Sequence, residues 1–216
     1  MRQVQPDLWE TASEHPAPGL STHAYVLAVP ERGNVMFYNT TNADEIDDVA
    51  RLGGLTSQYL SHRDEVAPSL RTIRERFGSS LRSARAELDV VTKVCPVDVV
   101  LDERVVDDNG VEVVPTPGHS PGSTSFRYRA PHGATYLFTG DTLYLGHDGA
   151  WRAGYIPGVS DATSLHESLE LLAELEPDVV VSSAFVGDAG IHEVERRRWP
   201  ELVRNAVRVL AQNVTS

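Results

Sequence analysis

The sequence predicts an α/β protein whose strands and helices form layers. Strand-like and helix-like runs alternate along the 216 residues, and hairpin signals lie between them. A composition of 41% hydrophobic and 23% charged residues is ordinary for a soluble globular protein. A chain of this length can bury a full core, so residues 1–216 are expected to form one domain.

The first half of the chain predicts a strand, a hairpin and two helix-containing units. The expected elements are a strand within 4–9, hairpin strands at 24–29 and 34–38, a helix at 42–52, a strand at 55–60 and a helix at 68–78. Asn42 is a suitable N-cap for the first helix, and Gly53 stops it. Gly78 ends the second helix in the same way.

The second half predicts two further hairpins and two further helices. The expected elements are a strand at 97–101, a hairpin of 105–106 with 111–114, a hairpin of 126–129 with 135–139, a helix from Asp161 or Ser164 to Glu176, a strand at 179–181 and a helix from Pro200. The Asn109-Gly110 pair is a strong hairpin signal. Residues 79–104 have a mixed pattern, and residues 144–160 form a long Gly-rich segment.

Charge and hydropathy exclude several classes of partner. A net charge of −12 leaves no basic excess to neutralise a nucleic-acid backbone, and it disfavours anionic membranes. No apolar run approaches the ~18 residues of a spanning helix, and the N-terminus has no apolar signal core. The single cysteine, Cys95, excludes an internal disulfide and fits a cytoplasmic location. We therefore expect a small-molecule substrate or ligand.

Polar side chains follow three strand-like runs, at the point where each run ends. His62 and Asp64 follow the run 55–60, His119 follows 111–114, and Asp141 follows 135–139. Prolines and glycines surround His119, which predicts a stiff, sharply turned loop that holds its side chain in one place. Two imidazoles and two carboxylates converging on one sheet edge predict a metal site.

These stretches together resemble the metallo-β-lactamase superfamily. The family pattern is His-x-His-x-Asp-His, a Pro-Gly-His loop, a Gly-Asp pair and a late histidine. TPGHSPGS at 116–123 and FTGDTL at 138–143 match it closely, and 60–65 matches in part. The resemblance extends over about residues 21–190. It implies a four-layer αββα sandwich, and it implies that Asp64 binds a second metal ion or accepts a proton from water.

Four positions depart from this family pattern. Leu60 and Glu65 stand where the first and third histidines of the first motif belong. Ala184 takes the place of the late histidine, and Asn39 follows the second core strand where an acidic residue is usual. Glu65 could still ligate a metal through its carboxylate. His147 and His192 are the other residues that could replace a missing ligand.

Two hypotheses for function follow from this site. The first is a metal-dependent hydrolase that cleaves an ester, thioester, lactone or related bond with a metal-activated water. It would hold one divalent ion, Zn²⁺ or Fe²⁺, with His62, His119 and Asp141, and Asp64 would be its catalytic base. The second is a non-catalytic or sensory protein with a degenerate metal site, in which His62 and Asp64 form only a salt-bridged turn.

Overall fold

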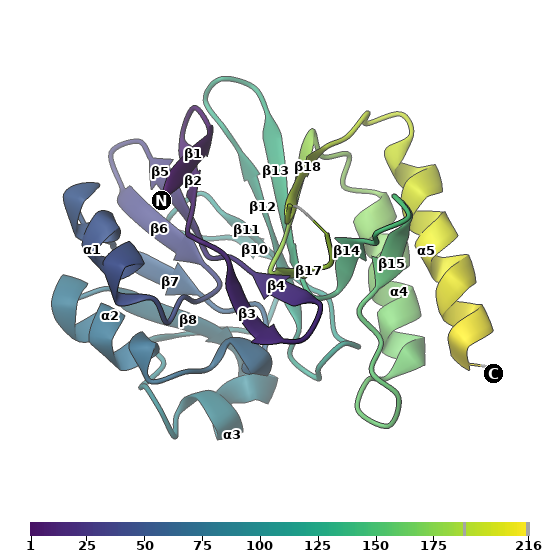
Figure 1. Cartoon of the computed structure of the whole chain (residues 1–216), viewed down its shortest axis with the longest axis horizontal. Coiled ribbons are helices and arrows are strands. Elements are labelled where there is room, and N and C mark those ends of the chain that lie inside the picture. Colours follow the sequence, from purple (N-terminus) through teal and green to yellow (C-terminus); the bar gives the residue numbers. More distant parts are fainter. Residues whose placement is uncertain (188, 215–216) are drawn as a thin grey trace.

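Two β-sheets lie face to face at the centre of the molecule, and helices cover the outer face of each (Figure 1). This computed structural model describes residues 1–187 and 189–214. The helices are α1 (Ala43–Arg51), α2 (Ser69–Phe77), α3 (Leu88–Val91), α4 (Ala162–Ala173) and α5 (Trp199–Val214). α1 to α3 lie against the first sheet, and α4 and α5 against the second (Figure 1). The predicted α/β fold with four αββα layers is confirmed.

The first sheet has seven strands in the order β1-β2-β5-β6-β7-β8-β9. They are β1 (Arg2–Gln5), β2 (Leu8–Glu10), β5 (Tyr25–Val29), β6 (Gly33–Phe37), β7 (Ser57–Tyr59), β8 (Ser80–Ala84) and β9 (Val99–Leu101). β5 and β6 form the predicted antiparallel hairpin, and β6 to β9 run parallel. Asn42 caps α1 by accepting a hydrogen bond from the Asp44 amide, and Gly78 ends α2 at φ 66°.

The second sheet has six strands in the order β10-β11-β12-β13-β16-β18. They are β10 (Val105–Val106), β11 (Glu112–Pro115), β12 (Thr124–Arg129), β13 (Thr135–Gly140), β16 (Val179–Ser182) and β18 (Ile191–Glu193). Both predicted hairpins are present, β10 with β11 and β12 with β13. β13 pairs with β16 in parallel. Asp161 caps α4 by accepting from the Ser164 amide.

Aromatic side chains from both sheets fill the space between them. Phe37 of β6 and Phe138 of β13 stack with ring centroids 3.8 Å apart, and Phe126 of β12 also packs against the Phe37 ring. Separate apolar clusters lie under the helices, one beneath α1 and α2 and one beneath α4 and α5. Burial on both faces of each sheet holds the strand ends in fixed relative positions.

Several elements were not predicted from the sequence. The region of mixed pattern contains β8, and the Gly-rich segment contains a hairpin of β14 (Leu143–Leu145) and β15 (Trp151–Ala153). Another small sheet joins β3 (Glu14–Ala17), β4 (Leu20–Thr22) and β17 (Ala184–Phe185). α4 ends at Ala173, short of the predicted Glu176, which has φ 45°. No helix in the described ranges is long and apolar enough to span a bilayer.

Candidate metal centre

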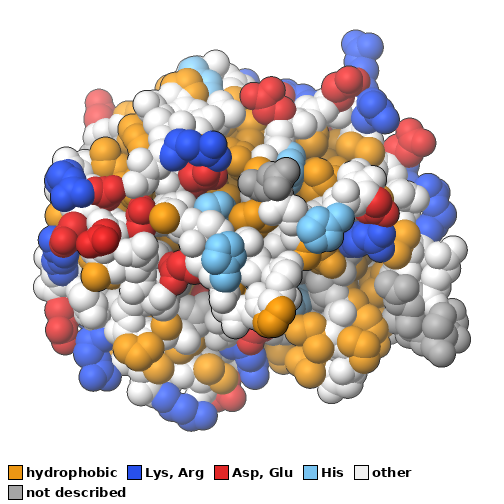
Figure 2. All heavy atoms as spheres, viewed as in Figure 1, with side chains coloured by type: hydrophobic (Ala, Val, Ile, Leu, Met, Phe, Trp, Pro, Cys, Tyr) orange, Lys and Arg blue, Asp and Glu red, His pale blue; other side chains and the backbone are white. Residues whose placement is uncertain are grey.

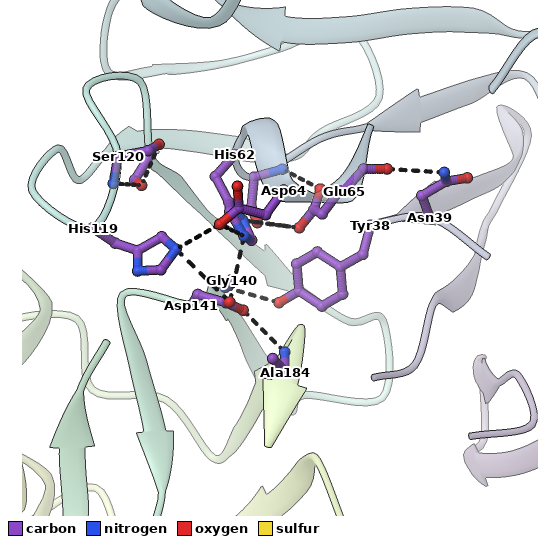
Figure 3. A network of polar contacts seen from close by, with 12 residues as sticks. Tyr38, Asn39, His62, Asp64, Glu65, His119, Ser120, Gly140, Asp141 and Ala184 are labelled. Carbon is purple, nitrogen blue, oxygen red and sulfur yellow. Dashed lines mark hydrogen bonds and ion pairs between the residues drawn. The ribbon is translucent and has the colours of Figure 1, made fainter. Parts of the chain in front are cut away.

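His62, His119 and Asp141 come together at the ends of strands from both sheets (Figure 3). His62 follows β7 of the first sheet, His119 lies in the loop between β11 and β12, and Asp141 follows β13. Each offers one ligand atom, and these atoms lie within 4.8 Å of one another. Nε2 of His62 is 3.4 Å from Oδ2 of Asp141, and Nε2 of His119 is 3.8 Å from that oxygen. Two nitrogens and one oxygen thus face a common point.

The His119 ring is fixed by a hydrogen bond on the side away from this point. Its Nδ1 lies 2.7 Å from the carbonyl oxygen of Gly154, just after β15. A carbonyl only accepts, so Nδ1 carries the proton and Nε2 presents its lone pair. Nε2 is buried and has no hydrogen-bond partner within the described residues. A Cβ at residue 154 would collide with the Asp141 carbonyl, so this close approach requires glycine.

The His62 ring is fixed in the same way by two neighbours on its Nδ1 side. Oγ of Ser61 lies 2.8 Å from Nδ1, and Oε1 of Glu65 lies 3.2 Å from it. The Glu65 carboxylate is buried and accepts from the Ser61 amide at 2.8 Å and from the Ser61 hydroxyl. Glu65 therefore lies against Nδ1, on the opposite side of the ring from the point that His119 and Asp141 face (Figure 3).

Asp141 is positioned by a backbone amide of β17 and by the fixed end of β13, the strand that precedes it. Its Oδ1 accepts from the Ala184 amide at 3.0 Å, which leaves Oδ2 facing the histidines. The preceding Gly140 has φ 54°, and its amide donates to the Tyr38 hydroxyl at 3.0 Å. That hydroxyl donates to the Val181 carbonyl at 2.7 Å. Tyr38 therefore ties the end of β13 to β6 and β16 (Figure 3).

Asp64 lies at the mouth of the site. Its side chain is 61% exposed, and Oδ2 is 3.5 Å from Nε2 of His119 and 4.0 Å from Nε2 of His62. The group of three close ligand atoms does not include it. The nearby His119 imidazole lowers the pKa of Asp64 despite partial burial, so this carboxyl is ionised at neutral pH.

The charges of His62, Asp141 and Glu65 stabilise one another. Burial alone would lower the pKa of His62, but the charges of Asp141 and Glu65 outweigh it and raise the pKa well above its usual value. Burial would raise the pKa of Asp141, but His62 outweighs it and lowers the pKa to about 2. A cation is therefore favoured between these groups, whether a proton on His62 or a metal ion.

Comparison with known proteins identifies the family. The sequence profile of the metallo-beta-lactamase superfamily matches residues 49–184. The chain belongs to the metallo-β-lactamase superfamily. Among solved structures, a metallo-beta-lactamase from Pontibacter korlensis is similar with a TM-score of 0.73, 14% identity and 97% coverage of each chain.

Two further solved structures are similar to this chain. An archaeal superfamily protein from Sulfolobus tokodaii matches with a TM-score of 0.65 and 18% identity over 94% of this chain and 85% of its own. A protein solved in a di-iron-bound form matches with a TM-score of 0.64 and 22% identity over 85% of this chain and 94% of its own. The structural similarity, at identities of 14–22%, establishes the fold alone.

The departures from the superfamily pattern have structural roles of their own. Leu60 is buried in an apolar cluster with Leu70 and Leu81, and Ala184 contributes its backbone amide to Asp141. The side-chain amide of Asn39 donates to the Glu65 carbonyl at 2.9 Å, which anchors the turn that carries His62. These contacts explain how the site keeps its shape with fewer histidines than the metallo-β-lactamase pattern.

The two histidines proposed to replace a missing metal ligand lie outside the group of His62, His119 and Asp141. His147 and His192 line a neighbouring cavity of about 880 Å³ together with His15, and neither belongs to the three-residue group. The positioning residues Ser61, Tyr38 and Gly154 were not identified from the sequence. Their types carry no signal of metal chemistry, and only the folded positions reveal their contacts.

Proposed function

We propose that this protein is a metal-dependent hydrolase of an ester, thioester, lactone or related small molecule. The observation that carries the proposal is the convergence of His62, His119 and Asp141, with both imidazoles held by their Nδ1 atoms. The buried, unpartnered Nε2 of His119 fits a metal ligand, because burying a polar atom without a partner is costly.

The donor set suits one divalent metal ion of intermediate softness. Two imidazole nitrogens and one carboxylate suit Zn²⁺ or Fe²⁺ and leave a coordination position for water. Such an ion would polarise a carbonyl group and lower the pKa of a coordinated water to about 7. The di-iron form of the relative described above supports iron as well as zinc.

The chain's own residues supply the remaining roles. Asp64 is ionised, lies beside His119 and is exposed at the mouth, so it can accept the proton of an attacking water. Glu65 and Gly154 keep the two imidazoles aimed at one point, and the Ala184 amide orients Asp141. The first-motif carboxylates thus divide into a proton acceptor, Asp64, and a positioning residue, Glu65.

The test combines metal analysis with hydrolysis. Protein loaded with Zn²⁺ or Fe²⁺ should cleave chromogenic esters, thioesters or lactones, lose this activity on chelation and regain it when the ion returns. Asp64→Asn should retain the metal but lower kcat by about 10²- to 10⁴-fold, the usual contribution of a general base. Loaded protein that cleaves none of the three classes would favour the non-catalytic alternative.

A further inference from the structure

A small cavity opens directly beside His119 and Asp141. It encloses about 210 Å³. Seven further side chains shape it: Leu20, Tyr144, Tyr155, Ile156, Ala184, Phe185 and Val186. A water molecule occupies about 30 Å³ in the liquid, so the cavity has the volume of roughly seven water molecules. Its walls come from β4, β14, β17 and the segment after β15, so it adjoins the ligand atoms on the Asp141 side.

The cavity contains no cationic side chain. None of the lining residues, all of which lie in the described ranges, is lysine or arginine. Its only carboxylate is Asp141, and Asp64 stands nearby at the mouth. Arg152 acts electrostatically on Tyr144, but its guanidinium is paired with Asp148 at 2.7 Å. An anionic group inside would therefore lose its hydration and meet negative charge.

A wider groove continues outward from this cavity. Leu20 and Val186 line both spaces, and the outer one encloses about 880 Å³. Three imidazoles border it, from His15, His147 and His192, and again no lysine or arginine is among its described lining residues. Histidine side chains gather near the middle of the face drawn in Figure 2. Imidazole nitrogens can donate and accept hydrogen bonds, so this part suits a polar group.

We propose that the substrate places a short, apolar, uncharged arm in the inner cavity, and that carboxylate- or phosphate-bearing arms are rejected there. Its larger, polar arm lies in the outer groove. The scissile bond then lies beside His119 and Asp141. This inference rests on the proposed hydrolase function for its relevance to catalysis, but the binding preference can be measured without any turnover.

The experiment compares two anilides of matched shape. N-phenyl-4-methylpentanamide ends in an isopropyl group, and N-phenylsuccinamic acid carries a carboxylate at the same place. Ligand-observed NMR gives both dissociation constants, on the protein as purified and again after chelation, because a carboxylate can gain affinity by binding to an ion. We expect the neutral anilide to bind at least tenfold more tightly in both states.

A charged variant checks that the cavity is the source of this preference. Ile156 is 41% exposed, so Ile156→Lys can place an ammonium at the cavity without burying it in the core. This change should lower the neutral-to-anionic preference at least tenfold, whereas Ile156→Met, which has similar length and no charge, should leave it unchanged. Circular dichroism and thermal unfolding confirm that both variants fold.

The outcomes separate this inference from the proposed function. Equal or tighter binding of the anionic anilide to the unmodified protein, or no binding of either compound, overturns the inference. Tight binding of the neutral anilide supports it, even if the corresponding phenyl ester is not hydrolysed by metal-loaded protein. In that last case the binding preference stands, and the hydrolase proposal is decided separately by the ester, thioester and lactone assay described above.

Discussion

Nε2 of His62 lies 3.4 Å from Oδ2 of Asp141, although the two residues follow strands of different sheets. Their proximity depends on the packing of the two sheets, whose aromatic core places the ends of β7 and β13 side by side. The site therefore exists only in the fully folded protein. Metal binding should stabilise the folded state by linkage, since the unfolded chain has no preformed site.

His119→Ala and Asp141→Ala should each abolish tight metal binding while the fold is retained. Each change removes one of three converging donors, and both side chains lie at strand ends outside the inter-sheet core. Calorimetric titration with Zn²⁺ measures the effect. His166→Ala, at an exposed position of α4, is the matched control and should bind normally. Unchanged affinity in both site variants would end this assignment.

Glu65 should determine metal affinity without being a ligand. Glu65→Gln keeps an acceptor beside Nδ1 of His62 but removes its charge, and Glu65→Ala removes both. We expect affinity to fall about tenfold in the first variant and about 100-fold in the second, the usual range for such outer contacts. Glu10→Gln, a buried carboxylate paired with Arg2, is the control. Equal affinity in the two Glu65 variants would contradict a graded positioning role.

The sequence predicted the strand-end positions of the site because those signals are local. Proline and glycine fix the loop around His119, and period-two runs mark the strands before His62 and Asp141. The sequence did not predict which side of the His62 ring Glu65 faces. That side depends on the 3₁₀ turn Arg63–Glu65, whose end is held by Asn39 from another strand end. Such long-range contacts leave no periodic pattern.

The same reasoning explains the elements that the sequence did not reveal. β8 has the sequence SLRSA, with Arg82 in its middle. The burial of this arginine is compensated by Asp107 and Asp108 of the β10–β11 turn, which pair with it at 3.0 and 2.7 Å. The short β14–β15 hairpin owes its place to packing of Trp151 against Trp199 of α5. In both cases a distant partner compensates for a weak local preference.

Tyr38→Phe should destabilise the protein by about 1–3 kcal/mol, the cost of leaving a buried polar group unsatisfied. The lost hydroxyl accepts from the Gly140 amide and donates to the Val181 carbonyl, and all three groups are buried. Urea unfolding measures the loss. Tyr128→Phe, elsewhere in the inter-sheet core, is the comparison and should cost less. A smaller loss at Tyr38 than at Tyr128 would refute its bridging role.

The stabilisation by metal should grow as pH rises. In the metal-free protein the pKa of His62 is raised, so its protonation contributes stability fully below about pH 6.5, and this contribution is lost as pH rises through the folded pKa. A metal needs the neutral imidazole, so protons compete with it at low pH. The pKa of Asp141, at about 2, keeps that carboxylate ionised throughout this range.

Calorimetric unfolding at pH 5.5, 7.5 and 9, with and without Zn²⁺, provides the measurement. The Tm difference between metal-loaded and metal-free protein should widen from the lowest pH to the highest. His62→Gln should remove most of this pH dependence. A Tm difference that is constant from pH 5.5 to 9 would mean that the histidines do not dominate the site.

The protein should hold at most one tightly bound metal per chain. His62, His119 and Asp141 provide the donors for one ion, and water can complete a tetrahedron. For a second ion there remain Asp64, which is 61% exposed, and a share of Asp141. Glu65 is turned toward Nδ1 of His62, so it is committed to positioning that ring.

Without a nitrogen donor, this second set should bind a borderline ion such as Zn²⁺ only weakly. Elemental analysis of extensively dialysed protein should therefore give a stoichiometry near one, and Asp64→Asn should leave it unchanged. A value near two that falls to one in Asp64→Asn would show that Asp64 completes a second site. A value near zero after soaking with Zn²⁺, Fe²⁺ or Mn²⁺ would leave His62 and Asp141 as a structural ion pair and favour the non-catalytic hypothesis.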